Sequence, residues 1–341
     1  MAPPGQRIPA PLALTMGDPA GIGPEITLKA YQRLKAREDL LFFVIADPRA
    51  LAVHGRSVED APRVVEIASP RDAAAAWRRG LPVLPLALPG EPQPGKSNKA
   101  HAPAVVSAID MAVRLTMTSE ASAVVTNPIH KRALYDVGFS HPGHTDYLAA
   151  LTRASRAPVM MLSVPELRVV PVTVHIPIKD VPKALNVEKI VHAARVTAEA
   201  LTRDFGIAKP RLAVTGLNPH AGEEGTMGLE EAKIIGPAVA ALRALGHIIT
   251  GPKPADTMFH PQARAQYDAA LCMYHDQALI PLKTIDFVHG VNVTLGLPIV
   301  RTSPDHGTAF DIAGQGVADP ESLIAAIEMA ASVAARRQAA R

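Results

Sequence analysis

Three histidines share one type of position, just past the carboxyl end of an apolar run with the length of a β-strand. They are His175 after VVPVTV, His220 after RLAVTGLNP, and His275 after AALCMY. In an open α/β sheet, ligands bind at the edge where the strands' carboxyl ends lie. Neutral imidazole is a common metal ligand, and three protein ligands leave a coordination position for a substrate. The pattern predicts a divalent-metal site; because the spacings are too long for a local motif, unrelated surface or capping histidines remain the alternative.

Polar neighbours accompany two of these histidines. Asp276 directly follows His275, where a carboxylate is suited to hold the second ring nitrogen of a metal-binding imidazole. Asn218 and Pro219 precede His220 in a turn that would present its ring, although the same pair also serves as an ordinary turn initiator. The neighbours favour a metal site without excluding plain turns.

The stretch Tyr274–Gly316 is dense in Gly, His, Asp and Thr. Lys283, Asn292 and Arg301 occur among its apolar residues. Lys and Arg bind phosphate, and the Asn amide offers both a donor and an acceptor. Thr302–Gly307 is predicted as a polar loop. Solvated loop charge remains the alternative for each residue by itself, but the density of the whole stretch favours a ligand site.

Two glycine-containing turns each precede a helix-like segment. Gly17–Pro24 (GDPAGIGP) is either a tight structural turn or an anion-binding loop, since a helix amino terminus attracts phosphate. It lacks the third glycine of the Rossmann dinucleotide fingerprint. Gly143–Asp146 (GHTD) opens a second helix, and Thr145 or Asp146 would be a plain N-cap if this turn binds nothing.

Apolar runs of strand length alternate with longer helix-like stretches along the chain. The predicted strands are Pro11–Met16, Leu41–Ala46, Ala121–Thr126, Val159–Ser163, Val169–Val174, Arg211–Thr215 and Ala269–Met273. The predicted helices are Glu25–Lys35, Ala102–Thr118, Val187–Arg203, Glu230–Leu245 and Glu321–Arg337. Leu81–Asn98, rich in Pro and Gly, is predicted as a loop, with a domain boundary or an edge strand as alternatives. The alternation indicates an α/β protein with a largely parallel sheet that is buried on both faces.

The composition excludes several classes of protein. A chain of 341 residues exceeds the usual size of one hydrophobic core, so two domains sharing a cleft are expected. Its hydrophobic content of 48% and charged content of 20% are those of a globular protein. A net charge of +3 and an aromatic content of 4% provide neither the concentrated basic surface nor the stacking platforms of nucleic-acid-binding proteins.

The single cysteine, Cys272, rules out an internal disulfide framework and a Cys-rich zinc site. Its apolar neighbours predict a small buried hydrophobe, and the scarcity of cysteine fits a reducing compartment. The amino-terminal residues lack the apolar core of a signal peptide, and no stretch approaches the ~20 apolar residues of a membrane span. We expect a cytoplasmic protein without membrane or nucleic-acid partners.

Six motifs, taken in order from residue 15 to residue 314, resemble the signatures of the 4-hydroxythreonine-4-phosphate dehydrogenase family. They are TMGDPAGIGPE, PGHTDYLA, NPHAGEEG, PADTMF, MYHDQALIPLK and GVNVTLGLPIVRTSPDHGTAFDIAG. The resemblance implies a two-domain α/β fold similar to isocitrate and isopropylmalate dehydrogenases, with the active site in an interdomain cleft. It implies a discontinuous nucleotide-binding domain of residues 1–130 plus 250–341, and a dimerisation and metal-binding domain of residues 131–249.

The resemblance also implies an activity and a set of site residues. NAD or NADP would accept hydride from 4-phosphooxy-L-threonine, and the resulting 2-amino-3-oxo acid would lose carbon dioxide to give 3-amino-2-oxopropyl phosphate, in pyridoxine 5'-phosphate biosynthesis. A divalent metal would act as a Lewis acid, with zinc expected first and magnesium or cobalt as alternatives. Carried over by motif, the metal ligands are His175, His220 and His275, and the substrate-binding residues are His144, Thr145, Lys283, Asn292 and Arg301. Catalytic acid–base residues and nicotinamide contacts are not assigned.

A homodimer with active sites shared between subunits is implied as well. His175 and His220 would come from the central dimerisation region and His275 from the returning carboxyl-terminal region, so that each metal site could draw on both chains. Two departures from the family pattern, Ala278 after HDQ and Glu224 in AGEEG, touch no ligand but blur the fine specificity.

Two other functions remain open on the sequence. The first is a related family dehydrogenase that acts on a phosphorylated sugar acid or an aromatic cis-dihydrodiol. The second is a zinc hydrolase using the three histidines, for which Asp276 is the only obvious general base. A non-catalytic binding module fits less well, because polar residues suited to ligands follow so many strands.

Overall fold

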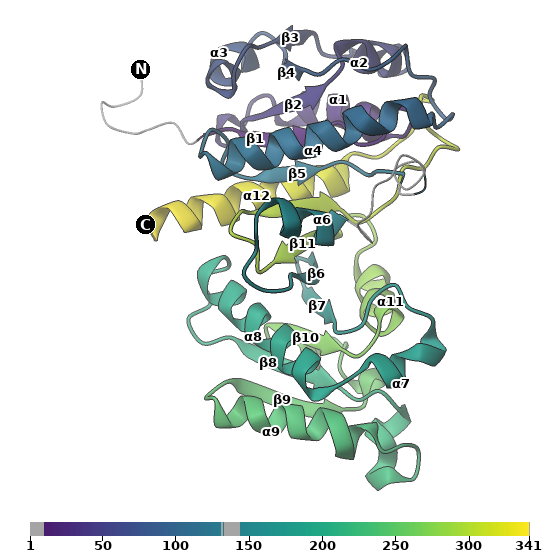
Figure 1. The fold of residues 1–341 in the computed structure, drawn as a ribbon, viewed down its shortest axis with the longest axis vertical. Coiled ribbons are helices and arrows are strands. Elements are labelled where there is room, and N and C mark those ends of the chain that lie inside the picture. The colour runs from purple at the N-terminus through teal and green to yellow at the C-terminus, as the bar shows by residue number, and fades with distance from the viewer. Residues whose placement is uncertain (1–9, 131, 133–143, 341) are drawn as a thin grey trace. The chain divides into compact units, whose positions relative to one another are not determined.

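The chain folds into two compact units, and the computed structural model describes residues 10–130, 132 and 144–340 (Figure 1). Unit 1 comprises Met1–Ser155 and Leu297–Arg341, and unit 2 comprises Arg156–Gly296. Within the described ranges, none of the helices combines the length and the apolar character needed to cross a membrane.

Unit 1 is built on a parallel sheet. Its strands, in spatial order, are β3 (Val64–Glu66), β4 (Leu81–Pro85), β2 (Phe42–Ala46), β1 (Leu12–Thr15), β5 (Val124–Thr126) and β12 (Arg301–Pro304). Both β1 and β2 are buried along their whole length, as expected for parallel strands that helices cover on both faces. All six strands point the same way, so their carboxyl ends meet at one edge.

The helices of unit 1 are α1 (Gly23–Leu34), α2 (Pro48–Gly55), α3 (Ala73–Trp77), α4 (Ala102–Met117), α6 (His144–Leu151) and α12 (Glu321–Ala339). The central strands β1, β2 and β5 contact α4, whereas α1 and α12 pack on each other. Buried Trp77 lies edge-on to Tyr31 and Phe42, with ring centroids 4.8 and 5.0 Å away. These aromatic contacts tie α1 and α3 to β2.

Unit 2 contains a mixed sheet. Its strands, in spatial order, are β11 (Val291–Leu295), β6 (Val159–Val164), β7 (Leu167–Pro171), β10 (Ala269–Cys272), β8 (Arg211–Thr215) and β9 (Ile248–Lys253). The strands β7, β10, β8 and β9 are parallel, and β6 is antiparallel to both β7 and β11. The parallel half therefore gathers the carboxyl ends of β7, β10 and β8 side by side.

The helices of unit 2 are α7 (Val181–Ala184), α8 (Val187–Arg203), α9 (Gly236–Ala244), α10 (Pro261–Arg264) and α11 (His275–Ile285). The sheet strands β6, β7 and β10 contact α11, and α8 packs on α9. Cys272 is fully buried in the core beside residues such as Val169 and Leu282, and burial raises the pKa of its thiol. The prediction of a small buried hydrophobe is thereby confirmed.

The α/β class and the largely parallel pairing are confirmed, and each of the predicted strands and helices exists. Arg211–Thr215 and Val187–Arg203 have the predicted bounds. The helix α8 begins where predicted because the side chain of Asn186 accepts a hydrogen bond from the Lys189 amide. The predicted helix Glu230–Leu245 differs in detail, since it opens with a π-helical turn at Glu231–Ile235 before α9.

Two segments predicted as loops contain strands. The first residues of Leu81–Asn98 form β4, an inner strand paired with both β2 and β3 rather than a loop or an edge. Its two prolines obscured it, because proline lacks the amide donor of a ladder. Thr302–Gly307 is not wholly a loop either, since its first residues belong to β12 and are buried. The polar side chains of Thr302 and Ser303 suggested a solvated turn, although both are buried.

The compact units have different bounds from the predicted domains. The chain returns to unit 1 at Leu297, whereas residue 250 was expected. The reason is that β9, β10 and β11 pair with strands of unit 2. His275 therefore belongs to the same compact unit as His175 and His220.

Candidate metal and substrate site

The three histidines follow three neighbouring parallel strands of unit 2, as their positions in the sequence predict. His175 follows β7, His275 follows β10 and His220 follows β8. The middle strand, β10, pairs in parallel with both of the others. All three residues therefore lie at the same edge of one sheet. This is the edge where α/β proteins bind ligands.

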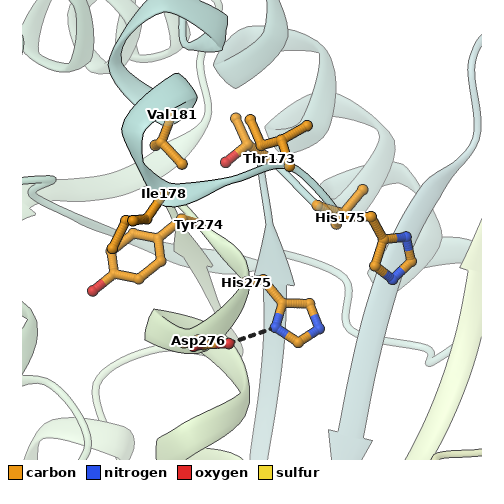
Figure 2. Close-up of a pocket in the computed structure, with 9 residues that line it drawn as sticks. Thr173, His175, Ile178, Val181, Tyr274, His275 and Asp276 are labelled. Carbon is orange, nitrogen blue, oxygen red and sulfur yellow. Dashed lines mark hydrogen bonds and ion pairs between the residues drawn. The ribbon is translucent and has the colours of Figure 1, made fainter.

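His175 and His275 lie together at a pocket of about 280 Å³ (Figure 2). Their ring centroids are 5.8 Å apart, with the planes tilted by 43°. The rest of the lining is mostly apolar, from residues such as Val174, Ile178 and Val181, and Tyr274 adds an aromatic wall. The pocket thus offers two imidazoles in a setting with few competing polar groups.

Asp276 orients the ring of His275. The distance from its Oδ1 to His275 Nδ1 is 2.7 Å, drawn as the dashed line in Figure 2. An ionised carboxylate can only accept a hydrogen bond, so Nδ1 carries the proton. The Nε2 lone pair of His275 is then available to a metal, which is the arrangement predicted from the His275-Asp276 pair.

The spacing of the two rings fits a shared divalent metal. With metal–nitrogen distances of about 2.0 Å, two imidazoles on one tetrahedral ion have ring centroids roughly 5 to 6 Å apart. The observed 5.8 Å agrees with that range. Among the described residues, however, no three His, Cys, Asp or Glu side chains lie close enough together to hold an ion. The structure therefore brings together two of the three predicted ligands.

His220 sits on a turn of unusual backbone conformation. Residues 220–224 all have positive φ, between 41° and 81°. Four of these residues carry a Cβ, for which the left-handed conformation is disfavoured. The imidazole is 64% exposed, and its Nδ1 lies 3.6 Å from Glu223 Oε2. Asn218 and Pro219 thus present the ring on an exposed turn, as predicted.

Two predicted substrate-binding residues belong to unit 2. Lys283 lies on α11, with its ammonium 5.3 Å from the ring centroid of exposed Phe287. Asn292 lies on β11 opposite Leu162 of β6, and its buried Oδ1 has no hydrogen-bond partner in the described structure. An unsatisfied amide oxygen on a half-buried residue is suited to accept a hydrogen bond from a ligand.

The other predicted substrate-binding residues belong to unit 1. Arg301 on β12 is only 4% exposed, and its Nη2 donates to Thr126 Oγ1 at 2.6 Å. Burial lowers the pKa of its guanidinium to about 10. Thr145 lies inside the first turn of α6, which begins at His144, so it is not the N-cap that was considered. The side chain of His144 lies outside the described residues.

The turn Gly17–Pro24 packs closely against neighbouring loops. Several of its backbone amides donate within the protein: that of Asp18 to the Pro128 carbonyl, that of Ala20 to the Asp18 carboxylate and that of Ile22 to the Thr308 carbonyl. Gly17 has a φ of +72°, and a Cβ there would come within 2.5 Å of the Pro128 carbonyl. These glycines allow close packing against neighbouring loops.

Sequence reasoning missed two side chains that hold the histidine-bearing loops. Gln277 joins the ends of β8 and β10, and Glu231 accepts hydrogen bonds from the residues that lead into the His220 turn. For Gln277, a signal existed, because it follows the His275-Asp276 pair directly. For Glu231, none existed, because it lies in a predicted helix and its partners are more than ten residues away in sequence.

Comparisons with known proteins agree with the sequence motifs. Residues 39–330 match the family described as Pyridoxal phosphate biosynthetic protein PdxA. The 4-hydroxythreonine-4-phosphate dehydrogenase of Caulobacter vibrioides is 53% identical over 332 residues, which are 96% of this chain and 98% of that protein. The enzyme of the same name from Paracoccus denitrificans is 51% identical over 333 residues, with 96% and 98% covered.

Solved structures show the same pattern. A 4-hydroxythreonine-4-phosphate dehydrogenase from Klebsiella pneumoniae superposes with a TM-score of 0.84 at 38% identity, covering 95% of this chain and 99% of that chain. A terephthalate 1,2-cis-dihydrodiol dehydrogenase from Burkholderia xenovorans gives a TM-score of 0.62 at 28% identity, with 95% and 98% covered. A branched-chain phosphotransacylase from Enterococcus faecalis, with a TM-score of 0.52 at 11% identity, shares the fold alone.

Proposed function

Because this chain belongs to the PdxA family of pyridoxal phosphate biosynthetic proteins, we propose that it is a 4-hydroxythreonine-4-phosphate dehydrogenase. The observation that carries the proposal is identity of about half of all residues with enzymes of that name along nearly the whole chain. The dihydrodiol dehydrogenase is less similar in both sequence and structure. A zinc hydrolase has no support from any of these relatives.

The proposed reaction is an oxidation followed by loss of carbon dioxide. The carbon that bears the secondary hydroxyl of 4-phosphooxy-L-threonine gives its hydride to NAD+ or NADP+, and the hydroxyl proton is released. The product has a ketone β to its carboxylate, so the carbon–carbon bond to the carboxylate breaks and its electrons move toward the ketone. Protonation then gives 3-amino-2-oxopropyl phosphate.

His175 and His275 would hold the metal, with His220 as the third ligand. When bound, the metal would supply Lewis-acid stabilisation of the negative charge that develops on the substrate oxygen. Asp276 fixes the tautomer of His275 for this purpose. The apolar side chains of the pocket lining would strengthen electrostatic interactions there once the substrate covers the site.

The remaining predicted residues would bind the rest of the substrate. Arg301 would supply a planar, charged donor for the phosphate, and its burial beside Thr126 keeps the guanidinium in one orientation. Lys283 would add a second positive charge. The free Oδ1 of Asn292 would accept a hydrogen bond from the ammonium or hydroxyl of the amino acid.

We propose further that the protein is a homodimer in which His220 completes the metal site of the partner subunit. The pairing of His175 with His275 within one chain and the exposure of His220 support this division. Unit 2 also exposes large apolar side chains near these residues, including Ile178 at 72% and Ile280 at 64%. Side chains of that kind are enriched at subunit interfaces.

A cytoplasmic location remains a prediction from the sequence.

A comparison of substrates tests the proposed specificity. Reduction of NAD+ or NADP+ would be followed with 4-phosphooxy-L-threonine, with unphosphorylated 4-hydroxythreonine and with an aromatic cis-dihydrodiol. We expect turnover only with the phosphorylated amino acid, because Arg301 and Lys283 would otherwise have no phosphate to bind. Faster turnover of the dihydrodiol, which carries no phosphate, would replace the proposal by the family alternative.

A further inference from the structure

Glu231 is a buried carboxylate that holds the approach to the His220 turn. It is 7% exposed and lies at the start of the π-helical turn before α9. Its Oε1 accepts hydrogen bonds from the amides of Leu217 and Asn218 at 2.7 and 2.8 Å, and its Oε2 accepts one from Asn218 Nδ2 at 3.0 Å. Three donors from the same loop thus converge on one charged group.

The turn that follows is the kind that needs such support. Residues 220–224 occupy the left-handed region, which residues with a Cβ rarely occupy in succession. Gly222 packs directly on the carboxylate, since a Cβ placed there would lie 2.6 Å from Glu231 Oε2. The glutamate therefore contacts the loop both before His220 and after it.

A second polar side chain links this loop to the pair His175 and His275. Gln277 Oε1 accepts from Thr215 Oγ1 and from the Met273 amide, both at 2.7 Å, and its Nε2 donates to the Gly216 carbonyl at 2.8 Å. Gln277, two residues after His275, thereby connects the end of β8 to the start of α11 by hydrogen bonds. These hydrogen bonds fix the chain up to Gly216 relative to His275. Glu231 holds the residues from Leu217 onward, which lead to His220.

We propose that Glu231 is a positioning residue that holds His220 in its metal-binding conformation. The inference deepens the proposed function and rests on its metal site. Only an ionised carboxylate offers acceptors on both oxygens, so it can bind two backbone amides and an amide side chain at once. Charged acceptors also make stronger hydrogen bonds than neutral ones, which suits a group that must offset an unfavourable backbone conformation.

Cobalt(II) binding to the full-length, metal-free protein tests this role, with visible absorption as the signal. Glu231→Ala is expected to weaken cobalt affinity about 10- to 100-fold, as losses of groups that orient metal ligands do. Glu231→Gln keeps an acceptor for the two backbone amides and is expected to fall between the alanine variant and the wild type. The matched control is Glu230→Ala, because Glu230 accepts a hydrogen bond from the side chain of Asn218 at 2.8 Å, whereas the Leu217 and Asn218 backbone amides donate to Glu231. Cobalt affinity in this variant is expected to change less than about threefold.

Hydrogen exchange of the metal-free protein gives a readout that does not depend on the metal. Peptides covering residues 216–228 are expected to exchange at least about tenfold faster in Glu231→Ala than in the wild type, while β8 and α9 stay protected. If Glu231→Ala does not fold, Gly222→Ala disturbs the same contact from the loop side and is expected to weaken cobalt affinity in the same way.

The outcomes separate this role from the proposed function. Wild-type cobalt affinity in Glu231→Ala, or in Gly222→Ala if the first variant does not fold, would overturn the role of Glu231 and leave the metal site standing. A weakened affinity with unchanged exchange of residues 216–228 would also overturn it, because the loop would not have moved. A wild-type protein that binds no cobalt would overturn the metal site itself, and this role with it.

Discussion

Single residues decide which atoms of the candidate site can act. His275 illustrates this, because its ring becomes a defined ligand only through the carboxylate beside it. The sequence placed Asp276 next to His275, and the structure adds the 2.7 Å contact that selects one tautomer. A neighbour in sequence can be predicted to be a neighbour in space, so this part of the site was accessible from the sequence.

Removing this contact should weaken metal binding without unfolding the protein. Asp276→Ala leaves Nδ1 of His275 without its acceptor, so both tautomers become populated and the ring rotates more freely. We expect metal affinity to fall about 10- to 100-fold, measured by competition with a coloured chelator. Asp286→Ala serves as the control, since the Asp286 carboxylate forms a hydrogen bond with another histidine of the same unit, His289. Equal losses in both variants would contradict a specific role for Asp276.

Substitutions of Arg301 test its proposed role in binding the substrate phosphate. Arg301→Lys keeps the positive charge but loses the planar pair of donors, and Arg301→Met loses both. We expect the KM for the phosphorylated substrate to rise about tenfold in the lysine variant and further in the methionine variant. Thr126→Val, which removes only the hydroxyl that Arg301 contacts at 2.6 Å, should have a smaller effect. Wild-type kinetics in Arg301→Met would remove Arg301 from the site.

Other residues of the site could not be found in this way. Glu231 and Gln277 act through partners that are distant in sequence, and their types are common on helix surfaces. Burial of Arg301 was also unexpected, because an arginine in a polar stretch suggests a solvated loop. Contacts of this kind depend on how helices return to the sheet, and a pattern of residue types along the chain carries no such information.

The helices and strands could be predicted from the sequence more fully than the contacts between them. Periodicity located α8 and β8 within a residue because a cap or an apolar run marks each boundary. The strand β4 was not predicted as an inner strand because it contains two prolines. The strand β12 was not predicted because its side chains are polar, although they are buried. Strand pairing also decided the extent of the units, since β9 to β11 joined unit 2 through hydrogen bonds that no local pattern specifies.

The helix α2 provides a test of element stability. Its N-cap, Asp47, is buried and accepts hydrogen bonds from the Arg49 and Leu88 amides and from the Arg49 guanidinium. Asp47→Ala should lower the free energy of unfolding of unit 1 by about 1 to 3 kcal/mol at neutral pH. The single tryptophan, Trp77, lies in unit 1 and reports its unfolding in urea by fluorescence. Asp39→Ala, which removes an exposed ion pair, should leave the midpoint unchanged.

The same variant has a predicted pH dependence. Burial raises the pKa of Asp47, but hydrogen bonds from Arg49 and Leu88 outweigh burial, so the pKa lies below its ordinary value of 3.8. A lowered folded-state pKa means that the stabilisation is fully present above the unfolded-state value and is lost as pH falls through the folded-state value. The difference between wild type and Asp47→Ala should therefore shrink below pH 3.8. A constant difference down to strongly acidic pH would show that the carboxylate charge is not involved.

In the whole molecule, we expect two chains to build each metal site. His220→Ala and His275→Ala proteins, each inactive, would be mixed, dissociated and reassociated. If His220 of one chain joins His175 and His275 of the other, each mixed dimer contains one intact and one doubly altered site. Roughly a quarter of the wild-type activity should return, since about half of randomly paired dimers are mixed. No recovery, with mixed dimers confirmed by mass, would mean that His220 and His275 serve the same site from one chain.

The proposed activity of this chain is the oxidation and decarboxylation of a phosphorylated hydroxyamino acid. The most direct measurement incubates purified protein with 4-phosphooxy-L-threonine, a divalent metal and NAD+ or NADP+, and quantifies the reduced nicotinamide and the carbon dioxide together. We expect both products to form in equal amounts with at least one of the two nicotinamides, and a chelator to stop their formation. No reduction of either nicotinamide in the presence of zinc, magnesium or cobalt would contradict the claim, as would reduced nicotinamide without carbon dioxide.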